Sequence, residues 1–473
     1  MVKEKNYNKI IMTVFLIGAF FMTLNETLLY IALPELMHYF DLPRTVIQWL
    51  ASGFMMVMGI VYPLSALIIQ WFTTRRLYLG LIVIFSIGSL IAGFAVNFPM
   101  LLAGRMIQAI GTGLMIALIT NTMLFIFDKS VRGKAIGTFS LVVMFAPAIG
   151  PTLSGVIIEA LGWRWLFFIV LPFMILTFIL GAIFLKNVGE VTRPKVDILS
   201  IIFSTVGITG IIYSISNISQ NDGIVLTPLI AITFVIGIVF GGLFVYRQLR
   251  LDTPILDFRV FLFHNYRKGM MVYVVILLSM FPTEIVLPMY LQGPVDLPAK
   301  IAGLVLLPGA LINGLLSPIM GGLFDKFGPR KLIVPGLIAL LGVSIFYIVV
   351  QPELPIFLFV LSYFVLMAGI STVMTPIGTN SLNALPSQSY PHGSAIYNMI
   401  QPVVGAIGIS TFIAMITGVQ NAKLKGETTV TQQLENEAMT SGLHVTYLFA
   451  LILIIIGIVI ALTITNASKE KED

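Results

Sequence analysis

The chain has 473 residues, of which 58% are hydrophobic and only 10% are charged. A soluble domain is typically about 25% charged, so most of this surface must face an environment other than water. The net charge of +6 does not indicate nucleic-acid binding, because the basic residues lie in short connections between apolar runs. The absence of cysteine excludes disulfides, thiolate metal sites and cysteine nucleophiles. This composition predicts an integral membrane protein.

Apolar runs long enough to cross a bilayer recur from near Ile10 almost to the C-terminus. A helix needs about 20 mostly apolar residues for this purpose. We therefore predict an all-α membrane protein with fourteen transmembrane spans, at 10–33, 46–70, 77–97, 99–127, 134–158, 164–186, 197–219, 226–246, 268–292, 299–323, 332–350, 355–380, 392–417 and 443–465. The basic segment before the first run is no signal peptide, because that run is too long and lacks a small-residue cleavage site.

The lysines and arginines are distributed unequally between the two sides of these spans. With the N-terminus inside, 21 fall on the inner side, 5 fall on the outer side and Arg105 lies within a span. Basic residues are enriched in cytoplasmic loops, so we expect a multi-pass protein of the plasma membrane with both termini in the cytoplasm. We expect the protein to lie in the lipid bilayer as a monomer.

Two connections are unusually polar. The inner connection 247–268 alternates apolar and charged residues, which predicts a short helix lying on the membrane surface. The segment 420–442 is predicted to be the longest outer loop, and we interpret it as a solvated cap rather than a binding domain.

The order of spans shows a weak internal repeat. Spans 1–6 and 9–14 each make a six-helix unit, which leaves spans 7 and 8 as an inserted pair. We therefore place an N-terminal six-helix bundle at 1–190, an inserted helix pair at 191–250 and a C-terminal six-helix bundle at 251–473. Repeated halves of this kind are a common plan of transporters.

Three charged residues lie deep within predicted spans: Glu26, Glu284 and Arg105. A charge at membrane depth costs at least about 2.5–3.5 kcal/mol, so it persists where it is paired, solvated or protonated. Helix rise places all three about 10 Å from the outer ends of their spans. Burial raises the pKa of a carboxyl group and a nearby arginine lowers it, so a carboxyl group that moves between such environments can load and release a proton. The structural alternative is a static Glu26–Arg105 pair that fixes packing.

Polar and aromatic residues within the spans surround these charges and are candidates for substrate binding. They are Asn25, Tyr30, Gln108, Asn121, Asn313, Tyr363, Tyr397, Asn398 and Gln401. Hydrogen bonding between helices is the alternative explanation for any one of them.

Several motifs together resemble the fourteen-helix EmrB/QacA-type drug:proton antiporters of the major facilitator superfamily. The first span reads LNETLLYIALP over residues 24–34, similar to the family's L-D-x-T-[IV]-V-N-V-A-L-P, with Asn25 at the usual Asp and the acid one place later at Glu26. The fourth span reads GRMIQAIGTG over 104–113, which matches G-R-x-x-Q-G-x-G apart from Ala109. Nearly the whole chain is covered by the resemblance.

Further motifs lie in the fifth span and after the tenth. Residues 146–155 read APAIGPTLSG, similar to the antiporter signature G-x-x-x-G-P-x-x-G-G, and include Gly150 and Pro151. Residues 321–331 read GGLFDKFGPRK, a match to G-x-L-x-D-[RK]-x-G-[RK]-[RK] that includes Asp325, Gly328 and Arg330. The resemblance implies a conformational gate at these positions. The equivalent loop after the second span has Gln70 where Asp is usual.

The resemblance implies the major facilitator fold and proton-coupled efflux of small amphipathic, often cationic compounds such as drugs, by alternating access and without a cofactor. It also implies that Arg105 acts with the span 1 acid in proton transfer. Export or flipping of a lipid or cell-envelope precursor is the alternative. A membrane enzyme is not indicated, because the sequence has no H-E-x-x-H motif and no cysteine. The sequence also lacks a G-x-x-x-x-G-K-[ST] loop, so no use of ATP is expected.

Overall fold

The computed structural model describes residues 2–126, 145–146, 149–187, 191, 197–220, 223–224, 227–252, 254–386, 389–425 and 431–466. Within these ranges, thirteen helices are long and apolar enough to cross a membrane. A shorter apolar helix, Ile149–Leu161, lies where the fifth span is predicted. The rest of the predicted span 134–158 falls outside the described residues, apart from residues 145–146. The fold is therefore the all-α membrane fold expected from the sequence.

The helices that precede the predicted inserted pair form one half of the molecule, called the N-half here. They are α1 (Val2–Phe40), α2 (Arg44–Ile47), α3 (Trp49–Trp71), α4 (Thr74–Gly93), α5 (Phe98–Ile126), the helix Ile149–Leu161, α7 (Trp165–Phe168) and α8 (Leu171–Phe184).

The helices that follow the inserted pair form the C-half. They are α11 (His264–Gln292), α12 (Ala299–Phe327), α13 (Arg330–Val349), α14 (Ile356–Asn383), α15 (Tyr390–Leu424) and α16 (Gln432–Leu462).

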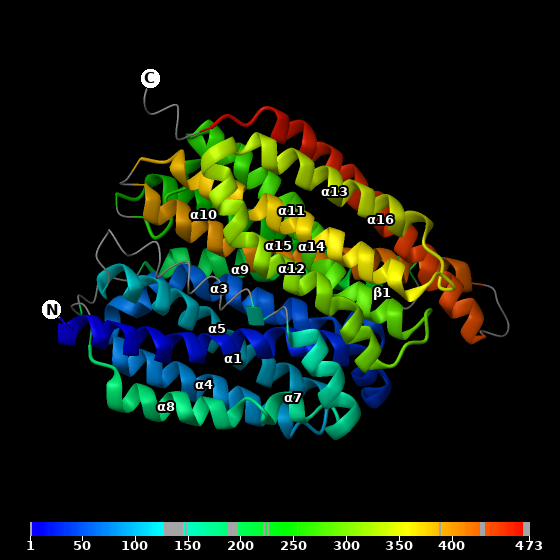
Figure 1. Cartoon of the computed structure of the whole chain (residues 1–473), viewed down its shortest axis with the longest axis horizontal. Coiled ribbons are helices and arrows are strands. Elements are labelled where there is room, and N and C mark those ends of the chain that lie inside the picture. Colours follow the sequence, from blue (N-terminus) through cyan, green and yellow to red (C-terminus); the bar gives the residue numbers. More distant parts are fainter. Residues whose placement is uncertain are drawn as a thin grey trace.

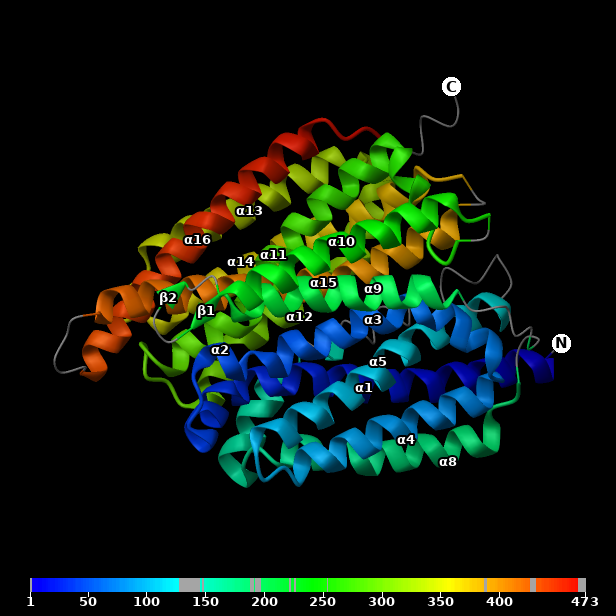
Figure 2. The same cartoon turned by 180° about the vertical axis from the view of Figure 1, so that it is seen from behind.

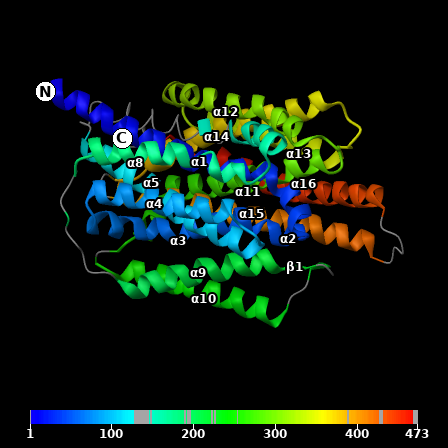
Figure 3. The ribbon, with the colours of Figure 1, turned by 90° about the horizontal axis from the view of Figure 1, so that it is seen from below.

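The inserted pair consists of α9 (Ile198–Asn217) and α10 (Pro228–Arg250). A hairpin of two-residue strands, β1 (Ser219–Gln220) and β2 (Gly223–Ile224), joins them in antiparallel register. The pair lies at one side of the bundle, beside α3 and α15 (Figure 3). The division into 1–190, 191–250 and 251–473 stays a prediction.

Both halves run the length of the bundle, the N-half below and the C-half above in Figures 1 and 2. The start of α1 and the end of α16 lie at the same end, which we call the proximal end; the opposite end is the distal end (Figure 1). An even number of crossings produces this arrangement. The proximal end is the one predicted to be cytoplasmic.

Glycine determines how closely the helices approach. A Cβ at Gly104 of α5 would lie 2.7 Å from the Ala92 nitrogen, and one at Gly88 of α4 would lie 2.7 Å from the Gly104 oxygen. Real side chains do not tolerate such contacts, so α4 and α5 require glycine at their crossing. Part of the 104–113 motif is therefore explained by helix packing.

The structure differs from the sequence prediction in two connections. The predicted outer loop 420–442 is mostly helix, because α15 extends to Leu424 and α16 already begins at Gln432. Polar residues that continue a helix beyond the bilayer carry no hydropathy signal, so the prediction of a loop was wrong. In the inner connection, the expected short helix is a single 3₁₀ segment, η1 (Phe258–Leu262).

Candidate functional site

Arg105 is the centre of a buried polar cluster in the N-half. Its side chain is fully buried, one residue after the glycine that lets α5 pack on α4. The guanidinium lies 4.3 Å from the centroid of the Phe54 ring, so the flat cation is stacked on an aromatic face.

The guanidinium donates hydrogen bonds to oxygens on two neighbouring helices, α1 and α3, and on its own helix α5. Nη1 donates to Asn25 Oδ1 at 3.2 Å and to Gln108 Oε1 at 3.1 Å. Longer bonds reach the backbone oxygens of Asn25 (3.4 Å), Glu26 (3.4 Å) and Leu50 (3.5 Å). Arg105 thus fastens α5 to α1 and α3.

Asn25, and not Glu26, faces Arg105. The Asn25 amide is 1% exposed and also donates to the Leu166 oxygen at 2.9 Å, so it is held from both sides. Glu26 offers Arg105 only its backbone oxygen, and its carboxylate takes part in none of the ion pairs found among the described residues. The static Glu26–Arg105 ion pair considered from the sequence is therefore wrong for this conformation. Neighbouring residues on a helix point about 100° apart, which frees the Glu26 carboxyl group for another direction.

Glu26 on α1 and Glu284 on α11 come from opposite halves, and these two helices pack against each other. Both side chains keep part of their surface accessible although both lie well within spanning helices. The two carboxyl groups lie within electrostatic range of each other and of Tyr30 of α1. The structure therefore brings together the two acids that are 258 positions apart in the sequence.

Tyrosines from several helices line the surroundings of these acids. Tyr30 and Tyr363 are buried, and Tyr363 of α14 lies within range of the Glu284 charge. Tyr62 of α3, which was not singled out in the sequence, lies within range of Glu26. A tyrosine inside an apolar span is the only signal that could have identified it.

The helix that carries Glu284 contains Pro282 and Pro288, each of which lacks a backbone donor. Between them, the Thr283 hydroxyl is hydrogen-bonded to the Tyr447 hydroxyl of α16 at 2.9 Å and donates to the Ser279 oxygen at 2.6 Å. These bonds hold the weakened turn of α11 and orient the residue that follows it.

A second aromatic group lies on the proximal side of Glu284. Tyr273 of α11 and Tyr397 of α15 are stacked, with ring centroids 4.1 Å apart and planes at 13°. The Tyr273 hydroxyl donates to Gln401 Oε1 at 3.5 Å, and Tyr62 lies within electrostatic range of Tyr273. Tyr397 and Gln401 were predicted to bind substrate, whereas Tyr273 was not.

The other predicted binding residues lie in different surroundings. Gln108 is fully buried in the Arg105 cluster, where Nε2 donates to Ser89 Oγ at 2.7 Å. Asn121 is part-exposed and lies about 20 Å further along α5 than Gln108. Asn313 Nδ2 approaches Met367 Sδ at 3.8 Å, and Asn398 is part-exposed on α15. Asn25 and Gln108 are committed to Arg105, which favours the helix-packing explanation for these two.

The predicted gate residues lie at two places. Gly328 ends α12 with a positive φ of 76°, a conformation that favours glycine, and Arg330 starts α13 with an exposed side chain. Asp325 lies in the last turn of α12, and the structure does not describe its side chain.

Gly150 and Pro151 lie where the N-half meets both its own α1 and the C-half. A Cβ at Gly150 would overlap Thr27 Oγ1, and one at Gly303 of α12 would lie 2.6 Å from the Pro151 oxygen. The fifth-span motif is thus a site of close packing at the boundary of the halves.

The distal end is closed by bonds between the halves. Gln292 Nε2 donates to the Ile31 oxygen at 3.2 Å, and Thr152 Oγ1 donates to the Gly303 oxygen at 2.9 Å. The Lys300 backbone nitrogen donates to Glu159 Oε1 at 3.1 Å. These contacts separate the acids from the distal side in this conformation.

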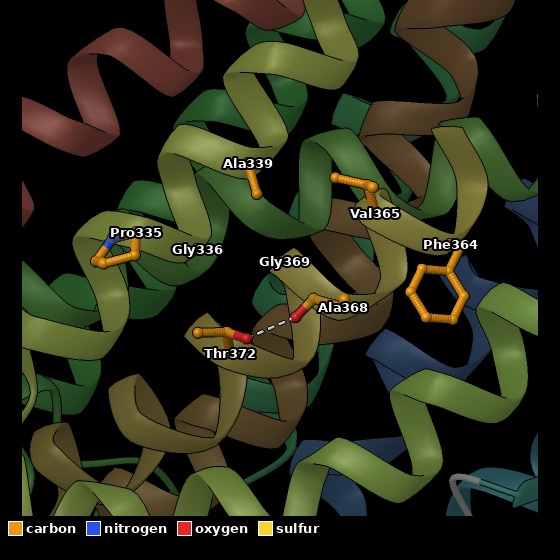
Figure 4. A pocket seen from close by; sticks show the side chains of 8 residues that line it. All are labelled: Pro335, Gly336, Ala339, Phe364, Val365, Ala368, Gly369 and Thr372. Atoms are coloured by element: carbon orange, nitrogen blue, oxygen red, sulfur yellow. Dashed lines mark hydrogen bonds between the residues drawn. The ribbon is translucent and has the colours of Figure 1, made fainter. Parts of the chain in front are cut away.

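A separate apolar cavity of about 220 Å³ lies between α13 and α14. Its lining includes Pro335, Gly336 and Gly369, with Phe364 at one side and Thr372 bonded to the Ala368 oxygen at 2.7 Å (Figure 4). Its lining contains no charged group and does not include Glu284 or Tyr363. Among the described residues, no group of His, Asp and Glu side chains has the arrangement of a metal site.

A family model and individual relatives both match most of this chain. The family model of the Major Facilitator Superfamily matches residues 15–409. Lincomycin resistance protein LmrB from Listeria innocua serovar 6a is 41% identical over 453 residues, which covers 96% of each chain. Lincomycin resistance protein LmrB from Bacillus subtilis (strain 168) is 40% identical and covers 95% of this chain and 94% of its own.

Among solved structures, a bacterial homologue of the human lysosomal transporter Spinster has a similar fold. The TM-score is 0.72 at 13% identity, over 98% of this chain and 97% of that chain. At this identity the similarity concerns the fold alone.

Proposed function

The chain belongs to the major facilitator superfamily, and from this premise we propose that it exports small amphipathic, often cationic compounds in exchange for protons. That it is a multi-pass membrane transporter of small molecules, and not an enzyme, follows from the family. The names of its relatives support a drug, with lincomycin as the first compound to test. Proton coupling and antiport are our proposal.

The observation that carries the proposal is the approach of Glu26 and Glu284, one acid from each half, which lie on the packed helices α1 and α11 and within electrostatic range of each other. Two carboxyl groups whose charges repel favour a proton or a cationic ligand between them. A cation that binds there displaces a proton, and a proton that binds there displaces the cation. Exchange at a shared site is antiport by competition.

The aromatic residues near the acids favour a ligand with flat or apolar parts. Tyr30 and Tyr363 lie beside the acids, and the stacked pair Tyr273–Tyr397 lies further toward the proximal end. Aromatic faces attract cations and pack on apolar groups. An amphipathic cation fits an environment that combines both.

Arg105 has a different role in this proposal. Its contacts with Asn25 and Gln108 hold α1 against α5 and keep a positive charge near Glu26 without a direct ion pair. It therefore positions the acid and biases its protonation, while Glu26 and Glu284 carry protons. For a neutral substrate, one proton driven by about 100 mV and one pH unit releases about 3.7 kcal/mol, enough for roughly 500-fold accumulation. Exchange of one proton for one monovalent cation moves no net charge, so only the pH unit drives it, with about 1.4 kcal/mol or roughly tenfold accumulation.

The test is uptake of radiolabelled lincomycin and of a panel of cationic dyes into inside-out vesicles, with and without an imposed proton gradient. We expect gradient-dependent accumulation by the parent protein. The Glu26→Gln variant should insert normally, bind substrate and lose accumulation. Full accumulation by a normally expressed Glu26→Gln variant contradicts the coupling role, and accumulation that ignores the gradient contradicts antiport with protons.

A further inference from the structure

The inserted pair is fastened to both halves through one residue. Ser216, in the last turn of α9, accepts a hydrogen bond at its backbone oxygen from Gln48 Nε2 at 3.3 Å. Its hydroxyl is hydrogen-bonded to the Ser410 hydroxyl at 2.6 Å. Gln48 lies between α2 and α3 of the N-half, and Ser410 lies on α15 of the C-half. All three side chains are buried.

These contacts lie toward the distal end, where other bonds already join the halves. The α9 helix packs along α3 and α15 together, and the β1–β2 hairpin that follows it also contacts α15 (Figure 3). The rings of Trp49 in α3 and Tyr213 in α9 are 6.1 Å apart. The end of α9 therefore spans the seam between the two halves.

The pair is built to act as one rigid piece. Glycines bring its helices into backbone contact, since a Cβ at Gly210 would lie 2.8 Å from the Gly237 Cα and one at Gly207 would lie 2.8 Å from the Gly241 nitrogen. At the proximal end, Asp197 and Arg247 form an ion pair at 2.8 Å. A rigid hairpin cannot follow two halves that move apart, so it must release at least one of them.

We propose that the inserted pair is a clamp that stabilises the closed distal end through the Gln48–Ser216–Ser410 contacts. Alternating access requires the distal ends of α3 and α15 to separate, and this breaks at least one of the two bonds of Ser216. The clamp is also easy to release: Gln48 Oε1 is buried without a hydrogen-bond partner in the described part of the protein, and opening exposes it to water. The proposal rests on transport by alternating access and not on protons or on any substrate.

The test uses the natural absence of cysteine, which makes a single introduced thiol a clean reporter. Ala302 is fully buried on α12, beside the Gly303 backbone that packs on Pro151 of the other half. An Ala302→Cys variant in right-side-out membranes is labelled with a membrane-impermeant maleimide, and the labelling rate reports distal opening. Ser216→Ala and Gln48→Ala are then added separately.

Each added substitution should raise the labelling rate about two- to tenfold, as loss of one net hydrogen bond implies. The matched control is Ser214→Ala on the same helix, because the Ser214 hydroxyl bonds within the pair, to Thr233 Oγ1 at 2.8 Å, and touches neither half in this way. It should leave the rate unchanged.

An unchanged rate in both Ser216→Ala and Gln48→Ala overturns the proposal. An equal increase in the Ser214→Ala control also overturns it, because general loosening of α9 then explains the effect. Expression level and thermal stability of each variant exclude misfolding as the cause of faster labelling.

Discussion

Arg105→Ala tests whether the buried guanidinium holds the N-half together. The change removes the donor of five hydrogen bonds and the cation stacked on Phe54, and it leaves Asn25 Oδ1 and Gln108 Oε1 buried without that donor. Three of the five bonds are 3.4–3.5 Å long and contribute little. The two shorter ones, at 3.1 and 3.2 Å, decide the magnitude.

A hydrogen bond to a charged group contributes about 1.5–3 kcal/mol, so loss of the two shorter bonds costs about 3 kcal/mol even where the neighbours relax. This corresponds to a roughly hundredfold increase in the unfolded fraction. Glu26→Gln is the matched comparison, because Arg105 touches only the backbone oxygen of that residue. We therefore expect Glu26→Gln to retain the stability of the parent and to lose coupling, whereas Arg105→Ala loses both.

The assay is thermal unfolding of detergent-purified variants followed by size-exclusion recovery, with substrate binding measured on the same samples. Arg105→Lys gives an intermediate case, since it keeps the charge but not the flat guanidinium and its donor geometry. An Arg105→Ala protein as stable as the parent refutes the structural role of the cluster. A Glu26→Gln protein as unstable as Arg105→Ala refutes the separation of the two roles.

Three further predictions follow from the site and its surroundings. Glu284→Gln should lower transport of cationic substrates by at least tenfold more than transport of neutral ones, because it removes one of the two neighbouring acids. The measurement compares one cationic and one neutral dye across a pH series, and equal losses contradict the cation-binding role. Asp325→Asn should slow cycling severalfold in the vesicle assay while Gln70→Ala does little, as the intact and the lost charge motifs imply; equal and severe defects count against a gate at Asp325. The Arg247 hydrogen bond lowers the pKa of the Asp197 carboxyl, so this ion pair stabilises the fold above the ordinary aspartate pKa, and the stabilisation is lost as the pH falls through the lowered value. The thermal unfolding temperatures of the parent and of Asp197→Asn should therefore differ by a constant amount from pH 5 to pH 8 and converge in stronger acid. A difference that changes near neutral pH contradicts this assignment.

Several features could be predicted from the sequence because they depend on local composition. The membrane class, thirteen of the fourteen spans and the identity of the deep charges follow from hydropathy, which a helix of about 20 residues expresses without reference to its neighbours. The importance of Arg105 could also be predicted from the sequence, because a single cation within an apolar run requires partners. Its glycine neighbours indicated close packing, which the α4–α5 crossing contains.

Other features depend on the direction of a side chain or on contacts between distant segments. Asn25 and Glu26 are adjacent, and only the rotation of α1 against α5 decides that the amide, and not the acid, bonds Arg105. The end of α15 and the start of α16 could not be predicted from the sequence, because a polar helix beyond the bilayer has the hydropathy of a loop.

The attachment of the inserted pair also depends on contacts between distant segments. Ser216, Gln48 and Ser410 are ordinary polar residues in three separate segments, and no local pattern marks them. Their meeting depends on how α9 lies against α3 and α15. Hydropathy reports the free energy of moving one segment into lipid, whereas the choice of partner within the membrane depends on the packing of all the segments together.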